Sequence, residues 1–183
     1  MEFGPVLETS RLILRVPQAR DFDAFATFSE DVEATRYIGG HMGRAAAWRK
    51  FLVMPGAWLV QGFAMFSVIE KSTGEWLGQL GPWQPEQWPG TEVGWAFKRE
   101  AWGRGYASEA GIAAIDWAFE TLGWSEVIHS IDPENGASIA LASRLGSTNR
   151  GPGRLPPPFE NTRIDIWAQS REQWQARRAG RAT

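Results

Sequence analysis

One stretch of the sequence joins a strand-like segment to a helix-forming segment through a tight glycine turn. Residues 91–97 alternate in polarity as a half-buried strand does, and residues 105–122 are rich in small residues that suit a helix packed on a sheet. Gly103 and Gly105 stand between them. Glycine lets the first N–H groups of a helix approach a ligand closely, and the helix dipole favours an anion there. The stretch predicts a strand–turn–helix unit, in which the glycines form either a plain turn or a phosphate cradle.

The rest of the pattern mixes hairpin strands with helices, which is typical of an α+β domain. Such an order predicts a mixed, largely antiparallel central sheet flanked by helices. Two proline- and glycine-rich runs at 151–158 predict a long loop, and the Arg-rich tail from Arg171 is expected to be solvated, either frayed or helical. Further strands are expected at 11–16, 62–70, 76–83, 126–131 and 162–168, and further helices from Asp21, over 44–53 before Pro55, and from the N-cap Asn135 to Leu145.

The composition is that of a soluble globular protein. The 183 residues are 43% hydrophobic and 22% charged, and the net charge of −2 provides no basic excess for a nucleic-acid backbone. No run reaches the roughly 18 apolar residues of a membrane span, and the start of the chain lacks a signal-peptide pattern. We therefore expect one cytoplasmic domain over residues 1–183, with a core at about 7–168, a tail at 169–183, and no nucleic-acid or membrane partner.

Several kinds of chemistry are excluded by residues that the chain lacks. It has no cysteine, which excludes disulfides, thiolate metal sites and a cysteine acyl-enzyme. Two histidines, His41 and His129, are too few for a histidine-rich metal site, and no G-x-S-x-G nucleophile elbow is present. The sequence predicts a protein that uses no metal and forms no covalent enzyme intermediate.

Tryptophan is unusually frequent, with 11 residues, many of them between 48 and 102. Because an indole buries a large area, packing in the core and in a cleft wall is the plainer interpretation. An aromatic-lined pocket for a small ligand is the alternative.

The order of the elements and two motifs resemble the GNAT superfamily of acyl-CoA-dependent N-acetyltransferases. The branch that contains the ribosomal-protein N-terminal acetyltransferases is the most similar. The resemblance spans about 7–168, although Trp102 takes the place where the superfamily loop usually has Gln or Arg. It rests on an opening strand at 7–15, a fourth strand at 92–97, a pyrophosphate loop at 102–110 and a late helix at 133–146.

The resemblance implies acetyl-CoA as the acyl donor. The turn would hold the diphosphate through its N–H groups, while the open edge of the fourth strand, splayed from the fifth, would pair with the pantetheine arm. Glu109 would repel a phosphate and is predicted to face away in a structural role. The implied cofactor-binding residues are Trp95, Ala96, Phe97, Trp102, Gly103, Arg104, Gly105, Tyr106, Ala107, Ser108 and Asn135.

Transfer to an amine requires a base, because only the neutral amine attacks and an α-amine has a pKa of about 7.7–8.0. Glu92, beside the expected thioester, is the preferred base, and a solvent-facing strand carboxylate is the alternative interpretation. Glu33 and Glu75 are weaker candidates. His129 and His41 are predicted to be structural rather than catalytic.

The general acid departs from the family pattern. Ala142 stands where many members have a tyrosine that protonates the leaving thiolate, and Ser147 replaces an aromatic residue after the late glycine. Ser138 remains as a donor near the sulfur. Asn135 is expected to contact the pantetheine arm, although its N-cap position explains it equally well.

The sequence thus predicts an N-acetyltransferase that moves an acetyl group directly to a primary amine in a ternary complex. The acceptor is either a small amine, which the tryptophans favour, or a protein N-terminus. A non-catalytic acyl-CoA-binding sensor or scaffold is the alternative function, because the tyrosine is missing. The sequence does not decide between a monomer and a homodimer.

Overall fold

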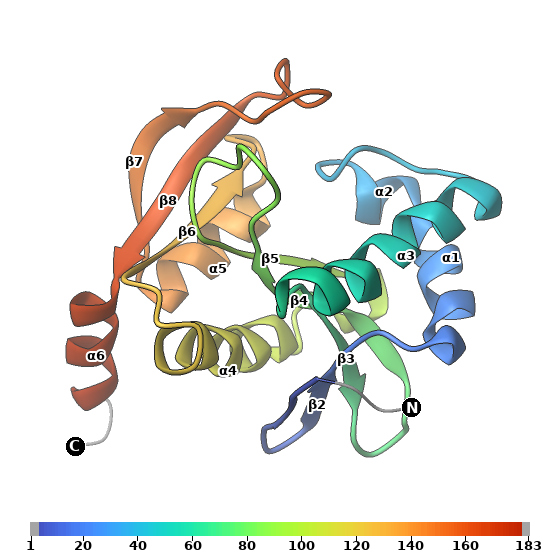
Figure 1. Cartoon of the computed structure of the whole chain (residues 1–183), viewed down its shortest axis with the longest axis horizontal. Coiled ribbons are helices and arrows are strands. Elements are labelled where there is room, and N and C mark those ends of the chain that lie inside the picture. Colours follow the sequence, from blue (N-terminus) through green and yellow to red (C-terminus); the bar gives the residue numbers. More distant parts are fainter. Residues whose placement is uncertain (1–3, 181–183) are drawn as a thin grey trace.

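The computed structural model describes residues 4–180, and an eight-stranded sheet forms the centre of this part of the chain (Figure 1). Every neighbouring pair is antiparallel except β5 and β6, which are parallel, so the predicted mixed, largely antiparallel sheet is confirmed. In the order β1-β2-β3-β4-β5-β6-β8-β7, the strands are β1 (Val6–Glu8), β2 (Leu12–Arg15), β3 (Phe66–Glu70), β4 (Trp76–Trp83), β5 (Glu92–Phe97), β6 (Glu126–Ile131), β8 (Ile164–Ser170) and β7 (Thr148–Gly153).

Helices cover both faces of the sheet. On β2, Leu12 and Leu14 join the core cluster that contains α4 and α5 residues, whereas Ile13 packs against the cluster of α1 and α3. Successive strand residues point to opposite faces, so these two clusters lie on opposite sides of the sheet. The helices are α1 (Phe22–Glu30), α2 (Val32–Thr35), α3 (Arg44–Gln61), α4 (Tyr106–Glu120), α5 (Gly136–Leu145) and α6 (Arg171–Ala179), with short 3-10 turns at Ala19–Asp21 and Arg99–Ala101.

β5 and β6 meet at one end and then diverge. Their register joins Glu92 to Ile128, and the Ile128 N–H donates to the Thr91 carbonyl at 2.9 Å. β4, by contrast, pairs with β5 along its whole length. Within the described residues, the edge of β5 past Val93 therefore has no strand partner on the β6 side. The predicted splay is confirmed, and it separates α1–α3 from the β6–β8 half (Figure 1).

The prediction that a helix ends before Pro55 was wrong. α3 continues through Pro55 to Gln61 and ends at Gly62, whose φ of 82° is left-handed. A proline inside a helix costs about 3 kcal/mol because it removes one hydrogen bond and crowds the preceding turn. Met54 and Trp58, on either side of Pro55, are both buried in the core, and their packing offsets that cost.

The predicted loop at 151–158 was also wrong in its first part, because residues up to Gly153 belong to β7. β7 is the last strand of the sheet, and its pairing with β8 shifts register between Asn149 and Pro152. An edge strand tolerates proline because one side of its backbone has no ladder to donate to. The loop proper runs from 154 to 163.

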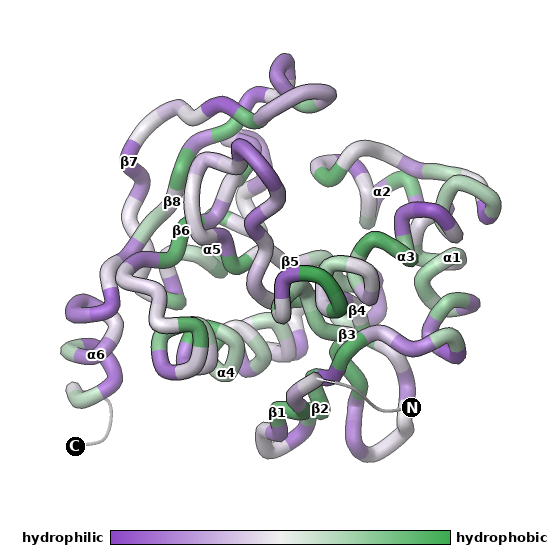
Figure 2. Tube along the Cα trace, in the orientation of Figure 1, coloured by the Kyte–Doolittle hydropathy of each residue, from purple (hydrophilic) through white to green (hydrophobic). Residues whose placement is uncertain are grey.

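The tail is helical, one of the two forms expected, but it is not merely solvated. α6 is mostly hydrophilic (Figure 2) and begins with a capping box between Ser170 and Gln173. Trp174 is nevertheless only 3% exposed, joins the main core cluster and donates from Nε1 to Asp116 at 2.7 Å. The core thus extends beyond Ala168. None of the helices within residues 4–180 is both long and apolar enough to cross a membrane.

Candidate active site

A cavity of about 420 Å³ lies at the splay between β5 and β6. Its walls come from β4, β5, β6, α3 and α5, together with three loops: 37–39, the loop after β4, and the loop before β8. A volume of this size suits a small ligand. Residues from distant parts of the sequence meet here, and the chemistry depends on which polar groups face the space.

Glu92, at the start of β5, faces this cavity and is only 7% exposed, so the solvent-facing interpretation was wrong. Trp88 Nε1 donates to Glu92 Oε2 at 2.5 Å, and Ser130 Oγ donates to the same oxygen at 2.9 Å. Burial raises the pKa of Glu92 to about 7, although these hydrogen bonds pull it down. A carboxylate with a pKa near 7 can accept a proton at neutral pH, as a general base must.

Gly94 allows Met65 to pack closely on β5 beside Glu92. A Cβ on Gly94 would lie 2.5 Å from Met65 Cε and 3.3 Å from Glu92 Oε1. The first distance is too short for a real contact, so a side chain here would displace Met65, which also lines the cavity.

Trp95, Ser138 and Asn135 meet on the α5 side of the cavity. Trp95 Nε1 donates to Ser138 Oγ at 3.1 Å, and Asn135 Oδ1 accepts from the Ser138 N–H at 3.1 Å as the N-cap of α5. A hydroxyl that accepts from an indole still has its own hydrogen to donate. The Ser138 hydroxyl is therefore available as a donor to a ligand, and the predicted N-cap at Asn135 is confirmed.

His129 bridges the splay in a way that the sequence did not reveal. It is 1% exposed, with Nδ1 at 2.7 Å from the Val93 carbonyl and Nε2 at 3.0 Å from Ser147 Oγ, which in turn accepts from Gln169 Nε2 at 3.1 Å. The carbonyl can only accept, so Nδ1 carries the hydrogen and Nε2 accepts from Ser147. Burial lowers the pKa of His129 to about 4, although the bond to Val93 raises it, so the ring is neutral. Its Trp95 neighbour lies 4.7 Å away between ring centroids.

The glycine turn before α4 is exposed, and α4 begins without a side-chain cap. Gly103 and Gly105 have left-handed φ angles of 70° and 80°, and the N-cap residue, Gly105, has no side chain that could accept from the first N–H groups of the helix. The first N–H groups of α4, at Tyr106, Ala107 and Ser108, are thus left for another acceptor. This arrangement fits an anion such as a diphosphate.

Trp102 fixes the turn to β5. Its indole donates to the Phe97 carbonyl at 2.9 Å, and its backbone N–H donates to the Arg99 carbonyl at 3.0 Å. That N–H is already used, so the donors open to a phosphate begin at Gly103. Phe97 itself is buried and is not among the residues that line the cavity, whereas Ala96 is.

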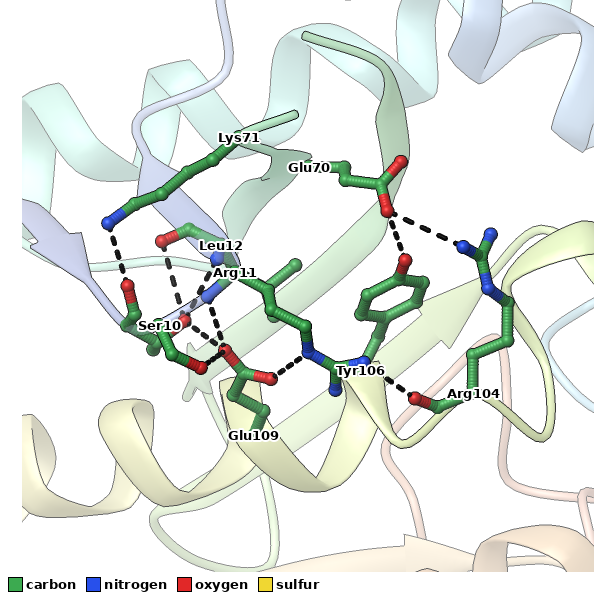
Figure 3. A network of polar contacts seen from close by, with 9 residues as sticks. Ser10, Arg11, Leu12, Glu70, Lys71, Arg104, Tyr106 and Glu109 are labelled. Atoms are coloured by element: carbon green, nitrogen blue, oxygen red, sulfur yellow. Dashed lines mark hydrogen bonds and ion pairs between the residues drawn. The ribbon is translucent and has the colours of Figure 1, made fainter. Parts of the chain in front are cut away.

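The other face of the first turn of α4 is tied to the β1–β2 hairpin (Figure 3). Glu109 accepts from Thr9, Ser10 and Arg11, with Arg11 Nε at 2.7 Å. Burial alone would raise the pKa of Glu109, but these bonds outweigh it and lower the pKa to about 2. Glu109 therefore faces away from the open N–H groups in a structural role, as predicted.

Tyr106 and Arg104 also point toward this anchor rather than toward a ligand. The Tyr106 hydroxyl bonds to Glu70, and Arg104 Nη2 lies 3.5 Å from the same carboxylate (Figure 3). The guanidinium groups of Arg11 and Arg104 lie 4.5 and 4.8 Å from the Tyr106 ring centroid. Only the backbone of Tyr106 is open to a phosphate, while half-exposed Arg104 adds positive charge near the turn.

The weaker base candidates lie elsewhere. Glu33 borders a separate surface hollow with Arg99, and Glu75 pairs with Lys98. Exposed His41 is not among the described residues that line the cavity. Both interpretations of the tryptophans hold in part, since Trp58 and Trp76 are buried in the core while Trp83, Trp88 and Trp95 line the cavity.

Ser130 and Lys50 line the cavity although the sequence carries no signal for either, and Trp88 was expected only as one of the tryptophans that could line a pocket. Trp88 stands four residues before Glu92, a spacing that gave no signal because it crosses a loop. Ser130 lies 38 residues from Glu92 on the neighbouring strand. The lining also contains the carboxylates Glu86 and Asp132. No cluster of three potential metal-ligating side chains occurs in the described part of the chain.

Comparison with known proteins agrees with this geometry. The family model described as "Acetyltransferase (GNAT) domain" matches residues 11–148. The chain is 32% identical over 164 residues to "Uncharacterized N-acetyltransferase p20" of Bacillus licheniformis, covering 88% of this chain and 92% of p20. The chain belongs to the GNAT acetyltransferase family and is an N-acetyltransferase.

Solved structures support the same assignment. An acetyltransferase from Agrobacterium tumefaciens superposes with a TM-score of 0.79 at 31% identity, over 93% of this chain and 98% of the other. The ribosomal-protein-S5-alanine acetyltransferase from Vibrio fischeri superposes with a TM-score of 0.73 at 18% identity, over 93% and 99%. At that identity the second likeness shows a shared fold alone, which is consistent with the predicted resemblance to the ribosomal-protein branch.

Proposed function

We propose that this protein transfers the acetyl group of acetyl-CoA directly to a primary amine held in the cavity, with Glu92 as the general base. The proposal rests mainly on the buried Glu92 carboxylate, whose pKa of about 7 suits proton removal from an ammonium group at neutral pH. Its hydrogen bonds from Trp88 and Ser130 fix its position in the cavity wall.

Acetyl-CoA fits the residues on the other side of the splay. The uncapped start of α4, from Gly103 to Ser108, would hold the diphosphate, and the unpaired edge of β5 at Trp95 and Ala96 would bind the pantetheine arm with Asn135. Acetyl-CoA supplies an acetyl thioester, so the chain needs no nucleophile of its own. A direct transfer within a ternary complex agrees with the absence of cysteine.

Ser138 is the group that would donate to the departing sulfur. Its hydroxyl faces the cavity while Trp95 occupies one of its lone pairs. Ala142, at the position of the family tyrosine, is fully buried and is not among the described residues that line the cavity. A thiolate is stable enough to leave with the help of a hydroxyl alone.

A small amine fits this cavity better than a protein N-terminus does. Two segments, the loop after β4 and the loop before β8, both contribute residues to its walls. The apolar side chains of Trp83, Trp88 and Phe159 enclose space for a compact body.

The test is CoA release from acetyl-CoA with a panel of amines, using wild type, Glu92→Gln and Glu86→Gln. Removal of a general base lowers the rate by about 10²- to 10⁴-fold, so we expect that loss in Glu92→Gln with acetyl-CoA affinity unchanged. Glu86, exposed at the cavity rim, is the matched control and should retain activity. Acetyl-CoA binding without turnover on any amine would instead favour a sensor or scaffold.

A further inference from the structure

One cationic side chain lines the cavity in the part of the chain that the structure describes. Lys50, on α3, is the only lysine or arginine among the described residues that line the space. Its helix is firmly held, because Ala47, Phe51 and Met54 around it are all buried in the core clusters. Lys50 thus lines the cavity from a firmly packed helix.

Lys50 has no anionic partner in the part of the chain that the structure describes. Its Nζ donates to the Ile38 carbonyl at 3.2 Å, and no described carboxylate lies within ion-pair distance. Burial lowers the pKa of Lys50, and no nearby charge offsets this effect. A half-buried ammonium without a counter-ion is destabilised, so a ligand anion would gain from its presence.

Of the three carboxylates among the described residues that line the cavity, Glu92 and Asp132 are engaged in other contacts, and Glu86 is exposed. Glu92 is held by Trp88 and Ser130, and Asp132 accepts from the Glu134 N–H at 2.8 Å. The lining also contains apolar side chains, among them Ile38, Met54, Met65, Trp83, Trp88 and Phe159. The cavity therefore offers a base, a separate cation and apolar side chains.

On the basis of the proposed function, we propose that the acceptor is an amine that carries a carboxylate on an apolar body, as a free apolar amino acid does, with Lys50 as the carboxylate anchor. Glu92 then takes the proton from the amine while Lys50 holds the acid group. Polyamines and aminoglycosides fit poorly, because their additional ammonium groups would meet Lys50 as a like charge. A peptide N-terminus has a neutral amide in place of the carboxylate.

The experiment compares matched pairs of acceptors in one assay. The pairs are L-phenylalanine with L-phenylalaninamide, and 6-aminohexanoate with hexylamine, which places the acid farther from the amine. In wild type we expect kcat/KM to favour one or both acids by about ten- to a hundredfold, the range of a charged hydrogen bond. Lys50→Met should abolish that ratio and Lys50→Arg should keep most of it, while Arg49→Met, on the exposed side of the same helix, leaves it unchanged.

The acid-to-neutral ratio within each variant is insensitive to a general loss of folded enzyme. Calorimetric titration of the same four compounds in the presence of CoA gives a second readout that needs no turnover. Tighter binding of an acid to wild type than to Lys50→Met supports the inference even if no amine is acetylated, in which case the proposed function alone fails. The inference is overturned if the neutral amines are acetylated as fast as the acids. It is also overturned if the acid-to-neutral ratio of kcat/KM is the same in Lys50→Met as in wild type. In both cases the proposed function stands.

Discussion

Burial and hydrogen bonding shift the pKa of Glu92 in opposite directions, and the hydrogen bonds can be removed by substitution. Burial raises its pKa to about 7, while Trp88 and Ser130 stabilise the ionised form. Ser130→Ala removes one of those hydrogen bonds, from the hydroxyl to Glu92 Oε2, while the Ser130 N–H remains 3.4 Å from Glu92 Oε1. The pKa of Glu92 should therefore rise further above 7.

Because the base must be ionised, the acid limb of the kcat/KM profile in Ser130→Ala should move to higher pH, with the rate on the alkaline plateau retained. The measurement is a pH–rate profile of the variant beside wild type. Ser143→Ala, an exposed serine on α5, is the control and should not move the limb. A limb that stays in place or moves to lower pH in Ser130→Ala would contradict the assignment of Glu92.

Among the elements, α4 begins without a side-chain cap, and we proposed above that this start binds the diphosphate of acetyl-CoA. Gly105 has a φ of 80°, a conformation that Asn and Asp tolerate better than other side chains. Gly105→Asp places a negative charge beside the open N–H groups, whereas Gly105→Asn has the same shape without the charge. We expect acetyl-CoA to bind at least tenfold more weakly to the Asp variant than to the Asn variant, because like charges repel at the diphosphate site.

Thermal unfolding of both Gly105 variants provides the control for that comparison. An aspartate near a helix N-terminus is favourable to the helix dipole, so the Asp variant should be at least as stable as the Asn variant. Equal acetyl-CoA affinities in the two variants would show that the diphosphate does not lie at the start of α4.

The His129 network holds β6 to β5 across the splay, and it makes stability depend on pH. The buried ring is neutral with a pKa of about 4, against 6.5 for an ordinary histidine. The unfolded chain therefore binds a proton more readily between these values, and stability falls as the pH decreases from about 6.5 to 4, by up to about 3 kcal/mol. Urea unfolding at several pH values should show this loss in wild type and a smaller one in His129→Gln. Identical pH dependence in both proteins would contradict the neutral, buried ring.

At the scale of the whole molecule, the C-terminal helix is part of the core. Trp174→Ala should lower the free energy of unfolding by about 3–5 kcal/mol, as removal of a buried aromatic side chain does. The measurement is denaturant unfolding, with Gln175→Ala on the exposed side of α6 as the control. A Trp174→Ala variant as stable as wild type would restore the prediction of a solvated tail.

The sequence predicted what depends on neighbours along the chain. The glycine turn, the Asn135 cap and the strands at 76–83 and 126–131 all have local signals, and each is found in place. Pro55 within α3 and the edge strand β7 were missed because tertiary packing and sheet position overrule local preference there. Local propensity alone cannot show either effect.

The candidate site was predicted in the same partial way. Glu92, Trp95, Asn135 and Ser138 were identified by motif, and the structure gathers them at one cavity. The contact of Glu92 with Ser130 joins residues 38 positions apart, and the contact of His129 with Ser147 joins residues 18 positions apart, on different elements in each case. A single sequence does not show which residues of distant elements come into contact. Lys50 was missed for the same reason, because only the fold places α3 beside the cavity.

The pH dependence of kcat/KM for acetyl transfer, measured in wild type and in Glu92→Gln, decides whether Glu92 is the general base. We predict that wild-type activity rises with pH through about 7, the pKa of Glu92, because the carboxylate must be ionised to accept the proton. The variant should be slower by about 10²-fold or more and should retain only the limb that belongs to the acceptor amine itself. A Glu92→Gln enzyme that keeps both the rate and the limb near pH 7 would contradict the account.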